Sequence, residues 1–213
     1  MLTAIFYWLV ANFFWVMLKI YNRLSVKGLN RALSAPFPVI IAANHCSNLD
    51  PIVMGAAFPK RLRYLAKSEL FSFAPLGFAI RALGAVPAKR EDLQGAAGAL
   101  KFLLERIQMG ESVLLFPEGH RSVDGKLKPL EGGVGLLAAK TGAPVVPAFI
   151  HGTFQALPPG SAGYMPVKIT LVFGEPIYVE KFGEGLSSKD LRQALTAQLD
   201  DALRKLEEEF LLD

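Results

Sequence analysis

The hydrophobic positions of the chain form short continuous runs that alternate with segments of helical periodicity. The runs with the length and composition of buried strands are residues 39–44, 61–67, 112–116, 144–150 and 168–174, with an extended piece at 84–88. Helical periodicity covers residues 50–57, 75–83, 92–110, 133–142 and 187–210. Strands that alternate with helices predict an α/β fold, with a mostly parallel sheet flanked by helices.

Local signals place several helix ends. Asp50 followed by Pro51 predicts an N-cap with proline at the first helical position. Gly110 and Gly142 follow helical segments, where glycine commonly ends a helix. Residues 19–37 lack either periodicity, and we interpret them as a basic connector.

The first twenty residues are unusually apolar. Between Ala4 and Leu18 the only strongly polar side chain is Asn12. As a helix, this stretch would be ~28 Å long, close to the hydrocarbon thickness of a bilayer. No basic segment precedes it and no small-residue cleavage site follows it, which disfavours a signal peptide. The pattern predicts a membrane-attachment helix over 1–24, spanning the bilayer or lying in one leaflet, followed by a domain over 25–213. The alternative is a buried helix of the core.

Charge and cysteine content narrow the classes of partner. The net charge is +4, which favours anionic partners such as lipid head groups, phosphates or nucleic acid. No nucleic-acid recognition motif accompanies it, so we expect membrane lipid as the partner and no nucleic acid. Basic residues follow the apolar stretch, which predicts attachment at a cytoplasmic membrane face, that of a bacterial inner membrane. A single cysteine, Cys46, excludes an internal disulfide and a multi-cysteine metal site.

His45 and Asp50 follow directly after the predicted strand 39–44. Polar residues at strand ends are where α/β folds place active sites. A turn that returns the Asp50 carboxylate to the imidazole would fix its tautomer and leave the other nitrogen as a base. With an ordinary pKa of ~6.5, such a base works near neutral pH. The alternative is a histidine whose hydrogen bonds are satisfied near a helix start.

Two further clusters offer groups for an anionic, hydroxyl-bearing ligand. "FPEGHRS" at 116–122 leaves a strand and turns at Gly119, so Glu118 and Arg121 would be held near a strand end. Arg121 can grip a phosphate in a fork, and Glu118 can accept hydrogen bonds from hydroxyls. Residues 67–90 end in two adjacent cations, of which Arg90 is the last. Solvated surface charges are the alternative for both clusters.

In their order and spacing these stretches resemble the glycerolipid acyltransferase family typified by 1-acylglycerol-3-phosphate acyltransferase. Asn44, His45 and Asp50 match its NH-x4-D motif, and the segment ending in Arg90 resembles its second motif. Residues 116–122 match FPEG-x-RS, and Val145–Pro147 match the VVP strand. The resemblance runs from about residue 38 to 180, and it implies a glycerol-phosphate acyltransferase-like domain.

The resemblance implies roles for these residues. His45 would deprotonate the free hydroxyl of a lyso-phospholipid, most readily the 2-position of 1-acylglycerol-3-phosphate, with Asp50 orienting it. That oxygen would attack the thioester of acyl-CoA or acyl-carrier protein, a co-substrate, so that no bound cofactor and no metal are expected. Arg90 and Arg121 would bind the phosphate, and Glu118 with Gly119 the polar backbone of the acceptor. Backbone N–H groups near the helix start would stabilise the oxyanion.

Departures from the family pattern keep other functions open. His120 stands where the family often has threonine, and Glu131 stands where a basic residue is common, with Lys126 and Lys128 upstream as replacements. Another lyso-lipid acceptor is therefore an alternative, as are a transacylase and a non-catalytic lipid-binding protein. Cys46 as a thiol nucleophile is disfavoured, because adjacent side chains in an extended turn point apart.

Overall fold

The computed structural model describes residues 2–72, 74–88, 96–161, 163–182 and 185–211 of the 213-residue chain. Its main sheet has five strands in the order β1-β7-β6-β2-β5. In that order the strands are Ser25–Lys27, Thr170–Phe173, Val145–His151, Ile40–Ala43 and Val113–Leu115. A second sheet pairs β3 (Tyr64–Lys67) with β4 (Ala85–Ala88), and a single bridge from Arg63 to Val113 joins the two.

The sheet is parallel except between β6 and β7. Ile40 pairs with Val113 on one side and with Val145 on the other, so β2, β5 and β6 run side by side in the same direction. Their carboxyl ends therefore meet at one edge, where residues 44–50 and 116–122 begin. The predicted α/β fold with a mostly parallel sheet is confirmed.

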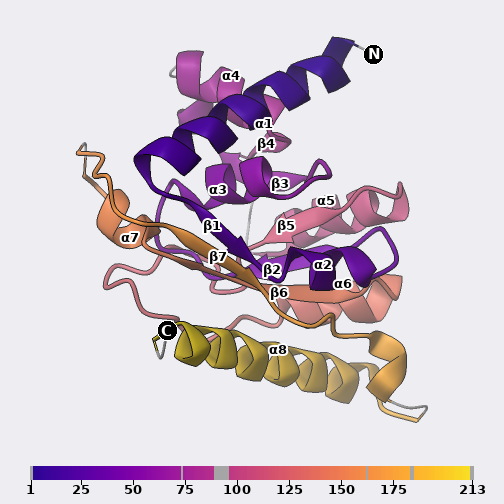
Figure 1. The fold of residues 1–213 in the computed structure, drawn as a ribbon. Coiled ribbons are helices and arrows are strands. Elements are labelled where there is room, and N and C mark those ends of the chain that lie inside the picture. Colours follow the sequence, from indigo (N-terminus) through magenta and orange to yellow (C-terminus); the bar gives the residue numbers. More distant parts are fainter. Residues whose placement is uncertain (1, 73, 89–95, 162, 183–184, 212–213) are drawn as a thin grey trace.

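Helices cover both faces of the sheet (Figure 1). On one face lie α1 (Leu2–Tyr21), α3 (Asp50–Ala57) and α4 (Ala74–Ala82). On the other lie α5 (Ala96–Gln108), α6 (Gly133–Thr141) and α8 (Ser188–Leu211). The short elements are α2 (Leu29–Ser34), η1 (Ser68–Phe71), α7 (Thr153–Ala156) and η2 (Val179–Phe182).

The alternation of side chains along β2 separates two cores. Ile41 and Ala43 join the cluster beneath α3, whereas Ile40 and Ala42 join the cluster beneath α5, α6 and α8. All four residues of β2 are fully buried, which explains why the strand is a continuous apolar run rather than an alternating one.

Two predicted local features differ from the structure. Asp50 is the first residue of α3 rather than its N-cap; Leu49 holds the cap position, because the Asp50 carboxylate turns back toward residues 45–47. The connector 19–37 contains β1 and α2. The strand β1 forms because it pairs with β7. The expected end of α6 is confirmed, since Gly142 follows it at φ 68°. The predicted start of α5 at 92 lies outside the described residues.

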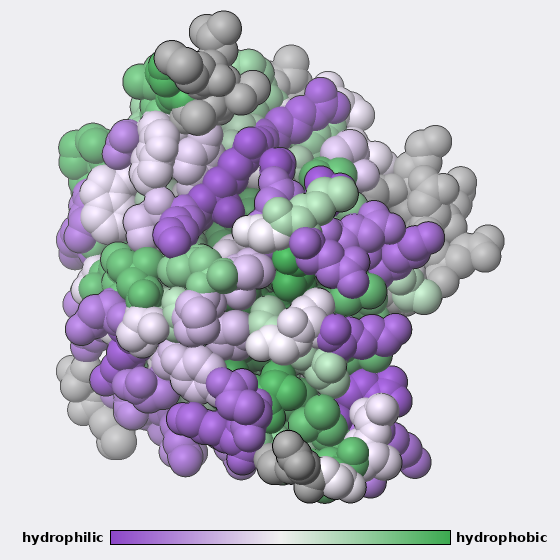
Figure 2. All heavy atoms as spheres, turned by 90° about the vertical axis from the view of Figure 1, so that its right-hand side faces the viewer, coloured by the Kyte–Doolittle hydropathy of each residue, from purple (hydrophilic) through white to green (hydrophobic). Residues whose placement is uncertain are grey.

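α1 packs by one face and exposes the other. Tyr7 and Ala11 are buried against Ile52 of α3 and Leu83, and Leu18 enters the main core. The opposite face exposes apolar side chains, namely Ile5, Trp8, Leu9, Phe13, Val16, Ile20 and Tyr21. Among the helices of the described residues, none combines the length and apolarity that a membrane crossing requires. Figure 2 shows one side of the molecule, on which hydrophilic side chains are mixed with hydrophobic patches, some of them at the upper edge.

Candidate active site

The turn after β2, residues 44–50, carries the candidate catalytic pair. It begins with Asn44, whose side-chain amide donates to the Ile150 carbonyl at 3.0 Å and whose Oδ1 accepts the Ile150 N–H at 2.7 Å. This two-way bond extends the pairing of β2 with β6 by one side chain. The turn therefore leaves the sheet from a fixed point.

His45 and Asp50 are in direct contact. Nδ1 of His45 lies 2.8 Å from Oδ2 of Asp50, a side chain with 0% exposure. The same oxygen accepts the backbone N–H groups of Cys46 and Ser47, each at 2.7 Å. A buried carboxylate that takes two backbone amides has a fixed orientation, so the imidazole that it contacts is oriented as well. The proximity predicted from the five-residue spacing is present.

The imidazole of His45 is also held by stacking. Its ring lies on the ring of Phe116, with centroids 4.0 Å apart and planes inclined by 16°. The His45 side chain retains 18% exposure. Because Nδ1 faces Asp50, Nε2 is the ring nitrogen left to take a proton from a ligand.

Glu118 lies beneath this turn and is only 1% exposed. Its Oε1 accepts the backbone N–H of His45 at 2.7 Å, and its Oε2 accepts that of Lys128 at 2.9 Å. Burial raises the pKa of the Glu118 carboxyl, and these two amide bonds oppose the rise. The carboxylate predicted to meet a substrate hydroxyl thus has both oxygens bonded to the protein backbone.

A further backbone bond closes the loop onto the turn. The Ser122 N–H donates to the His45 carbonyl at 2.7 Å, so His45 is held through its N–H, its carbonyl and its ring. Within the turn, the amides of Cys46, Ser47, Leu49 and Asp50 are all hydrogen-bonded. These four amides are therefore engaged within the protein, and the donors that would stabilise an oxyanion stay a prediction.

Gly119 lies in the left-handed region at φ 72°. The backbone conformation therefore favours glycine, and a Cβ there would stand 2.5 Å from Oε1 of Glu131, an exposed side chain that can move aside. This close approach places the Glu131 carboxylate directly beside the 116–122 loop.

Arg121 is on the same loop and donates from Nη1 to Oδ1 of Asn48 at 3.0 Å. The bond aims the guanidinium along the catalytic turn. Arg90, the other predicted phosphate ligand, lies outside the described residues. Of the predicted site residues, His45, Asp50, Glu118, Gly119 and Arg121 are brought together.

Of the two upstream lysines, Lys128 has its side chain paired elsewhere. Nζ of Lys128 lies 2.6 Å from Oδ2 of Asp124, and Oδ1 of Asp124 accepts from Ser122 and from the Lys126 N–H. The bond from Lys128 lowers the pKa of the Asp124 carboxyl well below its usual range. Lys128 therefore does not offer an uncompensated positive charge where Glu131 departs from the family pattern.

Cys46 is buried beside the pair, with Sγ 3.3 Å from Oγ1 of Thr153. Burial, followed by the charge of Asp50, raises the pKa of the thiol to about 12. A thiol with that pKa is almost wholly protonated at neutral pH, so Cys46 is unsuited to act as a nucleophile.

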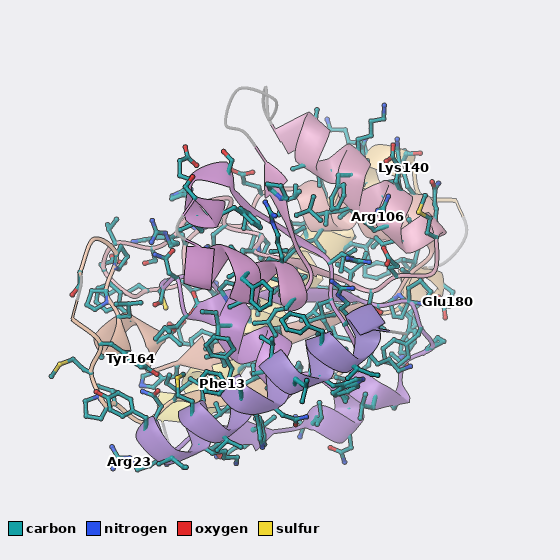
Figure 3. All side chains as sticks on the ribbon, turned by 90° about the horizontal axis from the view of Figure 1, so that it is seen from above. Phe13, Arg23, Arg106, Lys140, Tyr164 and Glu180 are labelled. Carbon is teal, nitrogen blue, oxygen red and sulfur yellow. The ribbon has the colours of Figure 1, made fainter. Side chains whose placement is uncertain are left out.

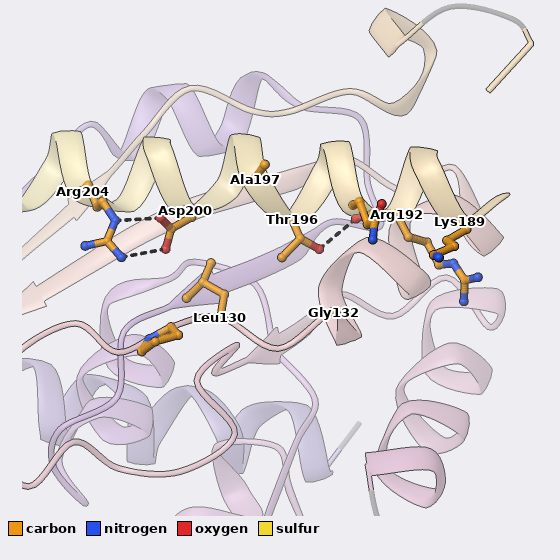
Figure 4. A pocket seen from close by; sticks show the side chains of 10 residues that line it. Leu130, Gly132, Lys189, Arg192, Thr196, Ala197, Asp200 and Arg204 are labelled. Atoms are coloured by element: carbon orange, nitrogen blue, oxygen red, sulfur yellow. Dashed lines mark hydrogen bonds and ion pairs between the residues drawn. The ribbon is translucent and has the colours of Figure 1, made fainter. Parts of the chain in front are cut away.

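The larger of the two grooves described here lies apart from this turn. A groove of about 600 Å³ runs between α8 and residues 129–132, where Arg204 is paired with Asp200 (Figure 4). None of the candidate catalytic residues lines it. Among the described residues, no three His, Cys, Asp or Glu side chains gather as metal ligands would.

Sequence reasoning missed three supports of the site, namely the ring of Phe116, the amide of Asn48 and the backbone of Ser122. Phe116 and Ser122 belong to the quoted 116–122 stretch, but their partners come from the turn about 70 residues earlier. Asn48 carries no local signal. Only the parallel pairing of β2 with β5 brings these segments together.

A buried carboxylate that orients a partly exposed histidine at the carboxyl edge of a parallel sheet defines an α/β protein with a candidate acid–base site. The chain belongs to the acyltransferase family, whose model matches residues 24–151. This match includes every candidate site residue.

Two relatives illustrate the similarity, and both are named 1-acyl-sn-glycerol-3-phosphate acyltransferase. The chain is 34% identical over 170 residues to a chloroplastic 1-acyl-sn-glycerol-3-phosphate acyltransferase of Brassica napus, covering 78% of this chain and 49% of that protein. It is 30% identical over 190 residues to the 1-acyl-sn-glycerol-3-phosphate acyltransferase of Bacillus subtilis, covering 89% and 87%. The chain thus spans about half the length of the plant relative and most of the bacterial one.

A solved structure shows the same fold. The crystal structure of the 1-acyl-sn-glycerophosphate (LPA) acyltransferase PlsC from Thermotoga maritima aligns with a TM-score of 0.67 and 28% identity. The alignment covers 87% of this chain and 71% of that one. The sheet and its flanking helices are therefore a family feature.

Proposed function

We propose that this chain transfers an acyl group from acyl-CoA or acyl-carrier protein to the free hydroxyl of a lyso-phospholipid. The acceptor is 1-acylglycerol-3-phosphate, acylated at its 2-position to give phosphatidic acid. The observation that carries the proposal is the 2.8 Å contact between His45 and Asp50 on the family's matched segment. The names of the relatives supply the substrate class.

In this proposal His45 acts as the general base. Nε2 takes the proton of the acceptor hydroxyl as its oxygen forms a bond to the thioester carbonyl. The C–S bond then breaks, and the imidazolium returns the proton to the leaving thiolate. Asp50 stabilises the imidazolium that exists between these steps, and its backbone bonds keep it from turning away. The acceptor itself is the nucleophile, which agrees with the raised pKa of Cys46.

Glu118 has a positioning role in this proposal. Because both of its oxygens hold backbone amides, it fixes the turn that carries His45 and the loop that carries Lys128. Arg121 contacts the acceptor instead. Its guanidinium is partly exposed, is anchored by Asn48 at one nitrogen and retains donors for a phosphate. Arg90 is proposed as a second phosphate ligand.

A second acceptor is favoured by Glu131. Its carboxylate lies against Gly119, within the loop that carries Arg121, and would repel a phosphate monoester. A phosphodiester with a cationic head group would meet a compensating charge at the same place. A zwitterionic lyso-phospholipid is therefore the alternative acceptor.

The proposed place of action is a lipid surface, at the cytoplasmic face of a bacterial inner membrane. The exposed face of α1 continues into an apolar groove of about 390 Å³ between α1 and α4, which includes Phe13, Phe14 and Phe78. With its other face buried on α3, α1 would lie in the plane of the lipid head groups. Lys19 and Arg23 at its end would meet anionic lipids.

The test is thiol release from acyl-CoA by the detergent-purified protein with a panel of lyso-lipids. We expect release that depends on the acceptor and that falls by about 10²–10⁴ in His45→Ala. The rank of acceptors with phosphate and zwitterionic head groups decides between the two candidates. Equal turnover in His45→Ala would exclude the histidine base. If acyl-CoA fails, acyl-carrier protein thioesters and phospholipid donors test the alternatives, and failure of all three favours a lipid-binding protein.

A further inference from the structure

Residues 163–167 lie against the C-terminal end of α1. Their backbone carbonyls accept hydrogen bonds from three consecutive residues there: Tyr21 Oη to the carbonyl of residue 164, Asn22 Nδ2 to those of 165 and 167, and Arg23 to that of 166. Oδ1 of Asn22 accepts in turn from the hydroxyl of Tyr164. The rings of Tyr21 and Tyr164 lie 4.9 Å apart between centroids. The segment is therefore held against the end of α1 by side-chain hydrogen bonds and a ring contact.

These bonds turn the backbone of the segment inward and leave apolar side chains outside. Met165 is 54% exposed. At the end of α1 that the segment contacts, Ile20 and Tyr21 are exposed as well. Pro166 is also exposed, so the exposed apolar surface of α1 continues onto the segment. Contiguous apolar patches on a protein surface mark interaction sites.

The position of the segment agrees with this. In Figure 1 the chain that leaves α7 rises at the left to the level of the C-terminal end of α1. Figure 3, seen from the α1 side, places Tyr164 and Arg23 at one edge of the molecule and Arg106 and Lys140 at the opposite edge. The aromatic and cationic side chains beside Met165 are those that favour the head-group region of a bilayer.

We propose that residues 163–167 form a second lipid contact, which extends the lipid-facing surface of α1 and inserts Met165 below the head groups of an anionic membrane. This inference rests on the proposed docking of α1. It adds a contact from a part of the chain that is more than 140 residues away from α1 in sequence. The axis of α1 and a contact point off that axis define a plane, whereas a molecule that docks by α1 alone can still roll about the helix axis.

The second contact is tied to the catalytic turn. The Met165 N–H donates to the Ala156 carbonyl at 2.8 Å, and Oγ of Ser47 donates to the Leu157 carbonyl at 2.7 Å. The lipid surface would therefore be related to the turn that carries His45 by two short links. A fixed tilt would present Nε2 to an acceptor that stays in the bilayer.

The test places single fluorescent probes on the full-length protein. Met165→Cys, Phe13→Cys and Met109→Cys are each labelled with an environment-sensitive thiol dye. Met109 is the matched control, because it is 67% exposed and lies beside Arg106 at the opposite edge. The unaltered chain measures background labelling of the buried Cys46. Vesicles of equal phosphatidylglycerol and phosphatidylcholine are compared with pure phosphatidylcholine.

We expect emission at Met165 and Phe13 to rise and shift to shorter wavelength with the anionic vesicles, and emission at Met109 to stay unchanged. A response at Phe13 without one at Met165 would overturn this inference and leave the docking of α1 intact. Silence at both positions would overturn both proposals. A response at all three positions would mean that vesicles take up the chain without a preferred face, which also overturns the inference.

A second measurement needs no label. Met165→Glu should weaken sedimentation with anionic vesicles roughly tenfold, since it replaces an inserted apolar side chain with a charge. Met165→Leu should restore binding, and Met109→Glu should leave it unchanged. Equal binding by Met165→Glu and the unaltered chain would contradict the inference.

Discussion

At the carboxyl end of β2 the chain buries polar side chains, whereas along α1 it exposes apolar ones. Asp50 and Glu118 have almost no exposure, yet each is bonded to backbone amides. Phe13 and Ile20 are largely exposed, and no described protein surface covers them. Both regions reverse the usual distribution of residues, and both reversals carry a free-energy cost. The polar reversal is offset by these backbone bonds except at Oδ1 of Asp50, which has no partner among the described residues, while the apolar one would be offset by the proposed lipid contact.

Asp50→Asn should have the largest effect on the polar region. The amide oxygen can still accept from Cys46 and Ser47, but the negative charge that stabilises the imidazolium is lost. We expect turnover to fall by about 10²–10⁴ with the fold retained, measured by thiol release and by thermal unfolding. Asp50→Ala should lower the free energy of unfolding as well, by about 1–3 kcal/mol for each buried amide left unpaired. Normal turnover in Asp50→Asn would show that the carboxylate does not assist the histidine.

Glu118→Gln separates positioning from substrate contact. One oxygen becomes an NH₂ group that faces a backbone N–H of His45 or Lys128, so the turn shifts. We expect kcat to fall about 10- to 100-fold with little change in the KM for the acceptor. Glu105→Gln, on an exposed part of α5, is the matched control. A raised KM with an unchanged kcat would mean that Glu118 binds the acceptor.

Phe13→Glu tests the apolar region. We expect roughly tenfold weaker binding to anionic vesicles, because one exposed aromatic side chain can no longer be buried in lipid. Thiol release with a short-chain, water-soluble acceptor should be unchanged, since Phe13 lies on the exposed face of α1 and not on the face packed against α3. Vesicle sedimentation and the soluble assay measure the two effects. Equal loss in both assays would mean that the substitution damages the fold.

Cys46→Ala should have the smallest effect on turnover, because the thiol takes no part in the proposed reaction. The thiol of the native protein should resist alkylation at pH 8 and react readily in denaturant. Its pKa is raised from 9.0 to about 12. The native state therefore holds this proton more tightly than the unfolded state, and stability should fall as pH rises through that range. The fall should be smaller in Cys46→Ala but not absent, because burial also raises the pKa of the Tyr7, Tyr64 and Tyr164 hydroxyls.

The sequence predicted the elements whose causes are local. The apolar runs identified β2, β5 and β6, and Asp50-Pro51 marked the start of α3 to within one residue. β1 escaped prediction because three residues carry no period; Ser25–Lys27 is a strand only because β7 lies beside it. The division of the chain into an attachment segment over 1–24 and a domain over 25–213 stays a prediction, and so does the membrane attachment.

The site was predictable in its members more than in their contacts. His45 and Asp50 are five residues apart, so a turn could bring them together. The partners of Glu118 are backbone atoms of His45, 73 positions earlier, and of Lys128, which no side-chain pattern encodes. Sequence reasoning therefore assigned Glu118 to the substrate, whereas its oxygens meet the chain itself.

That choice of partners bears on how the family can diversify. A carboxylate that grips main-chain amides is indifferent to the side chains on those amides, so position 128 should accept any residue except proline, which lacks the N–H. The side chain at position 128 can then differ without loosening the backbone bonds that hold the frame around His45. In the proposed mechanism, the two hydrogen bonds of Glu118 therefore hold the base in place whatever side chain stands at position 128.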